Sequence, residues 1–227
     1  MKIKALGAIL KLLVGLVIFI GLPLLGWGVN NLAGFFDNPI RSAYVALAAV
    51  MQVVVILKIP NVGAGRGPGT KTVHRQRLAL LFLQIIPLTI IIGAPLSDRR
   101  DFLAMGDSNT LRWCGLALFL LGMTLMHWAE ATLGRLFSVQ VTIQEGHRLV
   151  TDGPYGFLRH PRYSGIMLFA TGVSLTFRSW LGLLLAAALI AVLLWRIHDE
   201  EALLHETFGE EWRKYKRRTR RLIPFVY

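Results

Sequence analysis

The residues best equipped for chemistry lie in the stretch 149–165, which reads L-V-T-D-G-P-Y-G-F-L-R-H-P-R-Y-S-G and separates two long apolar regions. Its G-P-Y segment is typical of a turn, and Pro161 suits the first position of a helix, where its missing N–H costs nothing. His160 precedes that proline and is therefore biased away from helical geometry. The pattern predicts a turn, a short extended segment and a helix whose N-terminus, flanked by Arg159 and Arg162, attracts anions. The alternative is an ordinary basic loop between membrane helices.

A second polar group follows the last apolar run, where the chain reads R-I-H-D-E-E. Arg196 and Glu200 are four residues apart, so a helix places them on one face. Ionisable side chains near the membrane part of a helical bundle are candidates for function when they face its interior. The alternative is an ion pair on a solvated helix end, which is the commonest meaning of this spacing.

Composition indicates that membrane helices must position both groups. The chain has 227 residues, of which 54% are hydrophobic and 17% charged, and its mean hydropathy is +0.54. These values are typical of an integral membrane protein rather than of a soluble domain. The formal net charge of +12 collects outside the apolar runs, so membrane topology accounts for it and no nucleic-acid partner is expected. The single cysteine, Cys114, excludes an intramolecular disulfide.

The apolar runs predict an all-α integral membrane protein with about five membrane elements. Four are single spans, and the last is a helical hairpin with its tip near Arg178, because its first arm is at the short limit for crossing a core of about 30 Å. The second arm is expected to continue beyond the membrane. We divide the chain into N-terminal transmembrane helices over 1–133 and a C-terminal core over 134–227. The expected spans are 8–29, 41–59, 78–96 and 112–133, and the hairpin arms are 163–177 and 180–195.

Two other motifs are assigned no chemistry. The glycine-rich loop N-V-G-A-G-R-G-P-G-T-K lacks a preceding strand and the G-x-x-x-x-G-K-[ST] spacing, so a plain basic loop is favoured over a phosphate site. His127 and Glu130 are three residues apart and can share a helix face. A metal site needs more ligands nearby, so we expect an interfacial polar pair and no metal.

Loop charge predicts the orientation in the membrane. Basic residues dominate the first eleven residues, the loop 60–77 and the tail from His205, whereas the segments near 37 and 98–112 are nearly neutral. These segments alternate along the chain, so both termini and the loop 134–162 are expected in the cytoplasm. The two polar groups then lie on the same side of the membrane, where they can meet.

Three motifs extend these two groups: Q-V-T-I-Q-E-G-H-R-L-V-T-D-G-P-Y-G-F-L-R-H-P-R-Y-S-G, then R-I-H-D-E-E-A-L-L-H-E-T-F-G-E-E-W-R-K-Y, and finally R-L-I-P. In their combination the chain resembles the isoprenylcysteine carboxyl methyltransferase family, to which phospholipid N-methyltransferases are related. The resemblance covers roughly 134–227, and the earlier residues match only as apolar helices. It implies an S-adenosylmethionine-dependent methyltransferase whose cytoplasmic cofactor pocket is capped by the C-terminal segment. The absence of G-x-G-x-x-G after a strand agrees with a cofactor site outside the Rossmann class.

The resemblance also implies roles for single residues. The substrate side would be formed by Arg196 and Glu200, where Arg196 suits an acceptor carboxylate and Glu200 suits either orienting Arg196 or accepting a proton. His160 and the N–H groups of the helix start suit the carboxylate of the cofactor, and Tyr155 or Tyr163 suits its adenine or its sulfonium. The implied cofactor contacts are Gln140, His147, Arg148, Leu149, Val150, Tyr155, His160, Pro161, Arg162 and Tyr163.

The acceptor is expected to be a lipophilic small molecule, a lipid or a lipidated protein at the membrane–cytosol boundary. Carboxyl methylation of an isoprenylcysteine-type substrate is the reaction that the resemblance implies. A phospholipid amine and a small lipophilic thiol or acid fit the same kind of pocket. A non-catalytic membrane protein that keeps the fold is the alternative of a different class, and cofactor binding without turnover would favour it.

Overall fold

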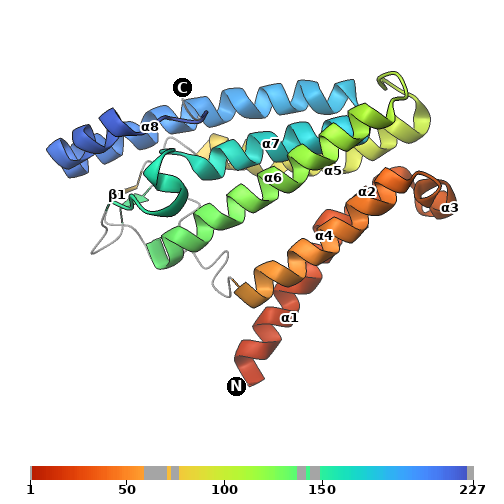
Figure 1. The fold of residues 1–227 in the computed structure, drawn as a ribbon, viewed down its shortest axis with the longest axis horizontal. Helices are drawn as coiled ribbons and strands as arrows, with labels where there is room; N and C mark the ends of the chain where they lie inside the picture. Colours follow the sequence, from red (N-terminus) through yellow and green to blue (C-terminus); the bar gives the residue numbers. More distant parts are fainter. Residues whose placement is uncertain (1, 59–70, 73–76, 137–141, 144–148, 224–227) are drawn as a thin grey trace.

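The computed structural model describes residues 2–58, 71–72, 77–136, 142–143 and 149–223, and Figure 1 shows that most of them are helical. Three 3-10 turns, η2 (Val29–Asn31), η4 (Gly134–Leu136) and η5 (Gly153–Gly156), lie between the longer elements. Two short strands, β1 (Lys71–Thr72) and β2 (Thr142–Ile143), pair antiparallel. The longer elements are α1 (Lys2–Leu16), the π-helical η1 (Val17–Gly21), α2 (Leu22–Trp27), α3 (Leu32–Phe36), α4 (Pro39–Lys58), α5 (Arg77–Arg100), α6 (Asn109–Leu133), α7 (Pro161–Thr176) and α8 (Trp180–Arg218).

Within the described residues, five helical stretches are long and apolar enough to cross a membrane. Helix α7 has only 16 residues and does not reach this length by itself. It packs against α8 as the first arm of a hairpin, which Figure 1 shows beside α5 and α6. The prediction of an all-α membrane protein whose last membrane element is a helical hairpin is therefore confirmed. The five stretches are Gly7–Trp27, Pro39–Leu57, Leu78–Arg100, Asn109–Leu133 and Trp180–Arg218.

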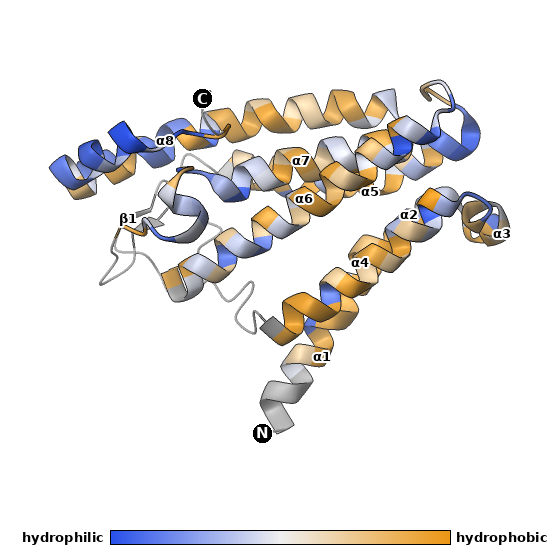
Figure 2. Ribbon diagram, viewed as in Figure 1, coloured by the Kyte–Doolittle hydropathy of each residue, from blue (hydrophilic) through white to orange (hydrophobic). Residues whose placement is uncertain are grey.

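The hairpin turns at the predicted place, and its second arm is unusually long. Arg178 has a positive φ of 50°, and the Ser179 hydroxyl accepts a hydrogen bond from Gly182 N at 2.9 Å, which caps α8. The helix bends at Gly209, whose φ of 51° and ψ of −115° are not helical, so its straight part ends near Phe208. That part is still about 43 Å long, more than the roughly 30 Å thickness of the hydrocarbon core. About the first twenty residues therefore cross the core, and the remainder projects beyond it. Figure 2 shows that this projecting part is hydrophilic.

A seam of glycines joins α6 to α7. Gly115 of α6 faces Gly172 of α7. Further along the seam, Gly122 faces Gly165. A Cβ atom at Gly122 would lie 2.5 Å from the backbone nitrogen of Phe169, a distance at which the atoms overlap. Small residues allow helix backbones to approach closely in membrane proteins, so the seam fixes α6 against the helix that begins at the stretch 149–165.

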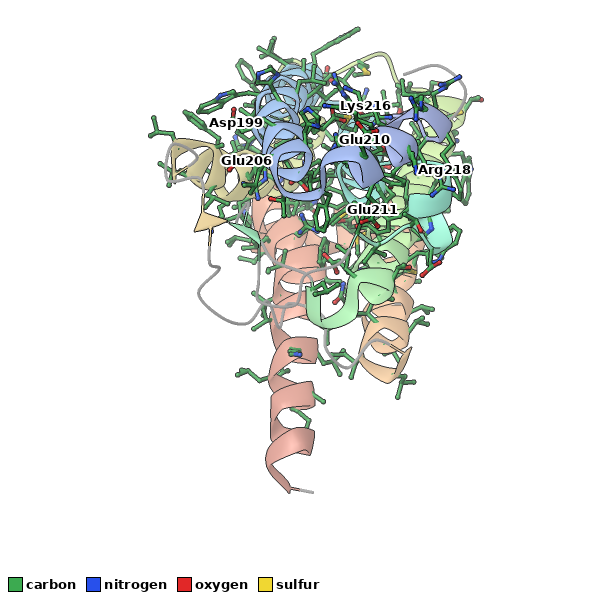
Figure 3. All side chains as sticks on the ribbon, turned by 90° about the vertical axis from the view of Figure 1, so that its left-hand side faces the viewer. Asp199, Glu206, Glu210, Glu211, Lys216 and Arg218 are labelled. Atoms are coloured by element: carbon green, nitrogen blue, oxygen red, sulfur yellow. The ribbon has the colours of Figure 1, made fainter. Side chains whose placement is uncertain are left out.

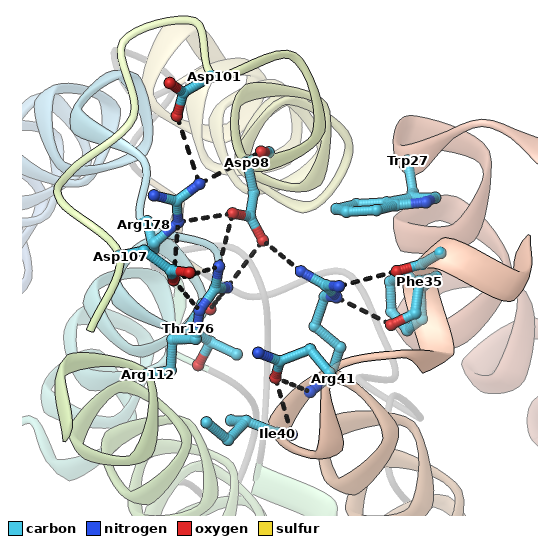
Figure 4. A network of polar contacts seen from close by, with 12 residues as sticks. Trp27, Phe35, Ile40, Arg41, Asp98, Asp101, Asp107, Arg112, Thr176 and Arg178 are labelled. Atoms are coloured by element: carbon cyan, nitrogen blue, oxygen red, sulfur yellow. Dashed lines mark hydrogen bonds and ion pairs between the residues drawn. The ribbon is translucent and has the colours of Figure 1, made fainter. Parts of the chain in front are cut away.

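The opposite end of the molecule is held by a buried carboxylate, shown in Figure 4. Asp98, at the end of α5, has a side chain that is 1% exposed. Arg112 of α6 donates to both of its oxygens, at 2.7 and 2.8 Å, and Arg178 Nε donates to Oδ1 at 2.8 Å. Arg41 of α4 donates to Oδ2 at 3.3 Å. This network joins the ends of α4, α5 and α6 to the turn between α7 and α8.

Candidate active site

The stretch 149–165 folds in the order that its sequence predicts. Gly153 has a positive φ of 54° and begins the 3-10 turn η5. The chain then extends until His160, whose φ of −126° and ψ of 55° are not helical and which caps the start of α7. Pro161 is the first residue of that helix and is buried. The proline therefore starts the helix where its missing N–H is not needed.

Tyr163 joins the two predicted polar groups. Its hydroxyl donates a hydrogen bond to Glu200 Oε2 at 2.7 Å and accepts one from Arg196 Nε at 2.8 Å. Arg196 and Tyr163 are only 3% and 7% exposed, whereas the Glu200 side chain is 30% exposed. The guanidinium carbon of Arg196 also lies 6.0 Å from the centre of the Tyr163 ring. The first turn of α7 and the part of α8 at the membrane boundary thus share one hydrogen-bonded chain.

His160 lies beside this chain and is almost fully buried. Its ring stacks on that of Tyr163, with centroids 5.5 Å apart and an angle of 9° between the planes. Its Nδ1 is 4.0 Å from Glu200 Oε1, and its Nε2 is 3.4 Å from Glu201 Oε1. The contact to Glu201 lacks hydrogen-bond geometry, and within the described part of the chain Nε2 has no hydrogen-bond partner. This buried nitrogen is therefore suited to a polar group of a ligand.

Two other predicted cofactor residues lie on neighbouring elements. Tyr155 of η5 is buried, and burial together with the nearby charge of Glu200 raises the pKa of its phenol, which stays protonated. Arg162 Nε donates to Glu130 Oε1 of α6 at 2.9 Å. His127 Nδ1 lies 3.4 Å from the other oxygen of Glu130, so the predicted polar pair exists and extends to Arg162. The structure thus directs Arg162 toward α6.

The remaining predicted contacts divide into two sets. Leu149 and Val150 are half-buried and precede η5 without regular secondary structure. Gln140, His147 and Arg148 lie outside the described residues, so their predicted roles stay predictions.

Glu201 is a site residue to which the sequence reasoning gave no role. Its buried carboxylate accepts hydrogen bonds from Arg159 Nε at 2.9 Å and from Arg221 Nη2 at 2.7 Å. Burial alone would raise the pKa of Glu201, but the nearby His160 ring and the hydrogen bonds from Arg221 and Arg159 outweigh it and hold this pKa well below its usual range. One feature of the sequence could have indicated this role: Glu201 is a second carboxylate next to Glu200, in a chain with many basic residues on either side.

The C-terminal segment lies against the extended part of the loop. Arg159 N donates to Arg220 O at 2.7 Å, and His160 N donates to Arg221 O at 3.1 Å. Ser164 Oγ donates to Leu222 O at 2.6 Å. The first two bonds join backbone groups, and the residues after α8 thus form a short parallel pairing with the segment that leads into α7.

The structure therefore defines a class of protein: an all-α integral membrane protein with a buried polar site where a helical hairpin meets the membrane boundary. In the described ranges, no group of three or more His, Cys, Asp or Glu side chains is placed to hold a metal ion.

Comparisons with known proteins show which family the chain resembles. Residues 115–206 match the model of the isoprenylcysteine carboxyl methyltransferase family. Protein-S-isoprenylcysteine O-methyltransferase B of Arabidopsis thaliana is 34% identical over 119 residues, which are 49% of this chain and 58% of that protein. A probable protein-S-isoprenylcysteine O-methyltransferase of Oryza sativa subsp. indica is 28% identical over 165 residues, or 70% of this chain and 84% of that protein. A solved structure of the eukaryotic intramembrane Ras methyltransferase of this family aligns over 99% of this chain and 97% of its own, with a TM-score of 0.48 and 20% identity.

The resemblance that the motifs predicted is confirmed, because residues 115–206 match the model of the isoprenylcysteine carboxyl methyltransferase family and the chain is similar to proteins named as such methyltransferases. The match to the Arabidopsis protein spans less than two thirds of that protein. The family match begins in α6 rather than near residue 134, where the motifs suggested that the likeness starts. The structure gives a physical reason, because α6 carries the glycine seam and supplies Glu130 to Arg162.

Proposed function

We propose that this protein transfers a methyl group from S-adenosylmethionine to a lipophilic acceptor at the membrane boundary. The reaction is most like carboxyl methylation of an isoprenylcysteine-type substrate. The observation that carries the proposal is the buried chain Arg196–Tyr163–Glu200, which lies where the membrane part of α8 ends. An acceptor with a lipid tail can keep that tail in the membrane while its polar head reaches this chain.

The residues beside this chain fit the cofactor. The buried Nε2 of His160 has no hydrogen-bond partner among the described residues. The stacked rings of His160 and Tyr163 form a flat aromatic surface. His160, Tyr155 and Tyr163 would hold the cofactor, together with the segment 147–150. When bound, S-adenosylmethionine supplies a methyl group that is already activated by its sulfonium. The protein then has mainly to hold and align the acceptor and to exclude water.

The charges at the site favour a carboxylate acceptor over an amine or a thiol. Arg196 is a buried cation whose Nε is held by the Tyr163 hydroxyl, and a guanidinium is well shaped to bind a carboxylate. A carboxylate acceptor carries no proton that must be removed, so it needs no base. Glu200 already accepts a hydrogen bond from Tyr163, which suits a residue that orients Arg196. An amine or thiol acceptor would require Glu200 to accept a proton instead.

The test is methyl transfer from labelled S-adenosylmethionine by the full chain in lipid vesicles. We expect label in an S-prenylated cysteine with a free carboxyl group, in an alkali-labile form typical of a methyl ester. The same acceptor with its carboxyl group converted to an amide should take up none. Label in the amine head of a phospholipid would replace this proposal with the phospholipid alternative.

A non-catalytic role is separated from the proposed reaction by measuring binding and turnover on one preparation. Calorimetry should show binding of S-adenosylmethionine to the intact protein. His160→Ala should weaken that binding, since it removes the buried Nε2 and the stacked ring. Binding that persists without methyl transfer to any fraction of a lipid and small-molecule extract would favour the non-catalytic alternative.

A further inference from the structure

The end of α8 leads into a dense basic run. Residues 213–221 read R-K-Y-K-R-R-T-R-R and hold seven basic residues and no acidic one. The run follows a helix whose first part crosses the membrane. Clusters of Lys and Arg directly beside a membrane helix are typical of segments that bind anionic lipid head groups. General attraction to the membrane needs only net charge, so a specific site requires a further structural feature.

The structure provides such a feature in a cavity of about 270 Å³. Figure 3 views the molecule from the end at which this part of α8 lies, with Lys216 and Arg218 labelled. Four of the five lining residues are basic, and none is acidic. The lining consists of Arg159, Lys216, Thr219, Arg220 and Arg221. The cavity thus brings one arginine from the segment before α7 together with basic residues from the end of α8.

The charges around the cavity leave an excess of positive charge. Glu201 binds Arg159 and Arg221 and contributes one negative charge to those two positive ones. Lys216 and Arg220 are exposed and add two further positive charges. A phosphodiester, whose two non-bridging oxygens share a negative charge and accept charge-assisted hydrogen bonds, matches a site with several cations arranged around one cavity.

The position of the cavity favours a lipid as the source of the phosphate. Arg159 precedes Pro161, the first residue of membrane helix α7, by only two positions. In the same loop Phe157 is 43% exposed and lies 6.1 Å, ring centre to ring centre, from Trp128, which is 47% exposed. Exposed aromatic residues at this place are typical of the membrane–water interface. The cavity therefore lies at the depth of the lipid head groups.

We propose that this cavity binds the phosphate of an anionic phospholipid head group. Bound lipid also stabilises the C-terminal segment on the loop. The backbone of Arg220 both accepts a hydrogen bond from Arg159 N and donates one to Phe157 O at 2.9 Å, so the cavity and the loop are one unit. A bound phosphate reduces the repulsion among the clustered cations, which favours the paired state.

The test compares the full chain in vesicles of phosphatidylcholine with the chain in vesicles that also contain phosphatidylglycerol. Hydrogen exchange should be slower in the second case for the backbone amides of Arg159, His160 and Arg220. In detergent, a titration with short-chain phosphatidylglycerol should show saturable binding. Equal exchange in both vesicles together with no saturable binding would overturn the proposal.

Two double variants that remove the same charge distinguish a specific lipid site from general electrostatic attraction to the membrane. Lys216→Ala with Arg220→Ala removes two lining cations, and the affinity for phosphatidylglycerol should fall on the order of tenfold or more. Arg217→Ala with Arg218→Ala removes the same charge from exposed positions that do not line the cavity, so most of the affinity should remain. An equal loss in both variants would mean that only net charge matters, and the proposed site would be rejected.

Two controls keep the outcome interpretable. The single variant Lys216→Gln replaces an exposed side chain and leaves every backbone hydrogen bond of the segment, so a loss of affinity in it supports the site independently of folding. Inorganic phosphate that protects the same amides as well as phosphatidylglycerol would assign the cavity to free phosphate and reject the lipid. All of these measurements read binding, so their result does not depend on whether the protein transfers methyl groups.

Discussion

At the scale of single residues, the hydroxyl of Tyr163 connects two elements and two charges. It is the atom through which Arg196 and Glu200 of α8 are held relative to the first turn of α7. The ring of the same residue packs against His160. Tyr163 therefore has two separable functions, one through its oxygen and one through its ring.

Tyr163→Phe should separate these functions. It removes the oxygen and keeps the ring, so Arg196 loses its hydrogen bond while the stack on His160 remains. Misplacement of a substrate-orienting group by about 1 Å costs on the order of 10²-fold in turnover, so kcat should fall by about that factor, with a smaller change in cofactor affinity. The measurement is kcat with the prenylated acid together with calorimetry of cofactor binding.

Tyr44→Phe is the matched control. Tyr44 of α4 is fully buried, and its hydroxyl has no hydrogen-bond partner among the described residues. Its removal should leave kcat and stability nearly unchanged. If Tyr163→Phe is as active as Tyr44→Phe, the hydroxyl does not position the acceptor side of the site.

The ionisation of Glu201 should set a lower pH limit for the docking of the C-terminal segment. Burial would raise the pKa of this carboxyl, but the nearby His160 ring and the hydrogen bonds from Arg221 and Arg159 hold it below the usual value of 4.5. A lowered pKa means that docking favours the ionised form. This stabilisation is therefore complete well above pH 4.5 and is lost as the pH falls below that value, by at most about 1.4 kcal/mol per pH unit for one proton.

Hydrogen exchange measured as protection factors between pH 6 and pH 4 checks this limit. Protection of the amides in 219–222 should fall toward pH 4 in the natural protein. Glu201→Gln cannot ionise, so its protection should be weaker at pH 6 and should depend much less on pH. An equal slope in the variant would assign the acid limit to other carboxylates.

Motif spacing predicted some of these residues and not others. His160 and Tyr163 became candidates through the resemblance that their motif carries, and helix periodicity placed Arg196 and Glu200 on one helix face. Glu201 was not, since its role depends on the path of the chain after α8. That path brings Arg221 back to α7, which no local pattern in the sequence indicates.

At the scale of elements, α6 belongs to the site as much as α7 and α8 do. The expected division at residue 134 left α6 with the N-terminal spans. The structure packs it on α7 through glycines and connects Glu130 to Arg162. The sequence showed the four spans and the hairpin through their hydrophobicity, but periodicity alone does not say which apolar helix packs on which.

Gly122→Ala should separate α6 from α7. The added Cβ would meet Phe169 N at 2.5 Å and Gly165 O at 2.6 Å, so the backbones must move apart. The free energy of unfolding in detergent should fall by about 1 to 3 kcal/mol, the usual cost of overpacking. Cofactor affinity should fall with it.

Gly93→Ala is the control for this substitution. Gly93 lies inside α5, and nothing lies within 4 Å of a Cβ atom placed there. Alanine is the better helix former, so stability should stay equal or rise by about 0.5 to 1 kcal/mol. A similar loss in both variants would show that glycine itself, rather than the close approach, matters for these helices.

At the scale of the whole molecule, the two ends of the bundle do different things. One end carries the candidate active site, and the other carries the buried carboxylate of Asp98 with three arginines (Figures 1 and 4). The sequence shows that the segment 98–112 is nearly neutral in charge. It did not predict that Asp98 would gather arginines from three other elements, because such long-range pairing has no local pattern.

Asp98→Asn should destabilise the whole bundle. The amide keeps the shape of the side chain but removes the negative charge that faces Arg41, Arg112 and Arg178. Loss of one partner of a buried ion pair costs about 3 to 5 kcal/mol, so denaturation in detergent should occur at markedly lower temperature. Asp101→Asn is the control, since the Asp101 side chain is 80% exposed and its pair with Arg178 is worth about 1 kcal/mol or less. Equal effects would contradict a specific role for the buried carboxylate.

The two ends also predict an orientation in the membrane. The active-site end carries the basic run 213–221 and the end of α4, after which the sequence 60–77 is rich in basic residues, whereas the Asp98 end adjoins loops of nearly neutral charge. Since basic loops stay on the cytoplasmic side, we propose that the candidate active site faces the cytoplasm and the Asp98 network faces outward. Asp107, with a side chain that is 72% exposed, marks the outer end, and the exposed Arg217 marks the inner one.

Cysteine labelling of intact cells tests this orientation. The exposed Cys114 must first be replaced, so that each variant carries one reactive thiol. A membrane-impermeant maleimide should then label Asp107→Cys in intact cells and Arg217→Cys only after the membrane is permeabilised. Because the two positions lie at opposite ends of helices that cross the bilayer, the two results must be opposite in any single orientation. The reverse pattern would place the candidate site outside, where the cytoplasmic cofactor cannot reach it, and would contradict both the orientation and the proposed methyl transfer.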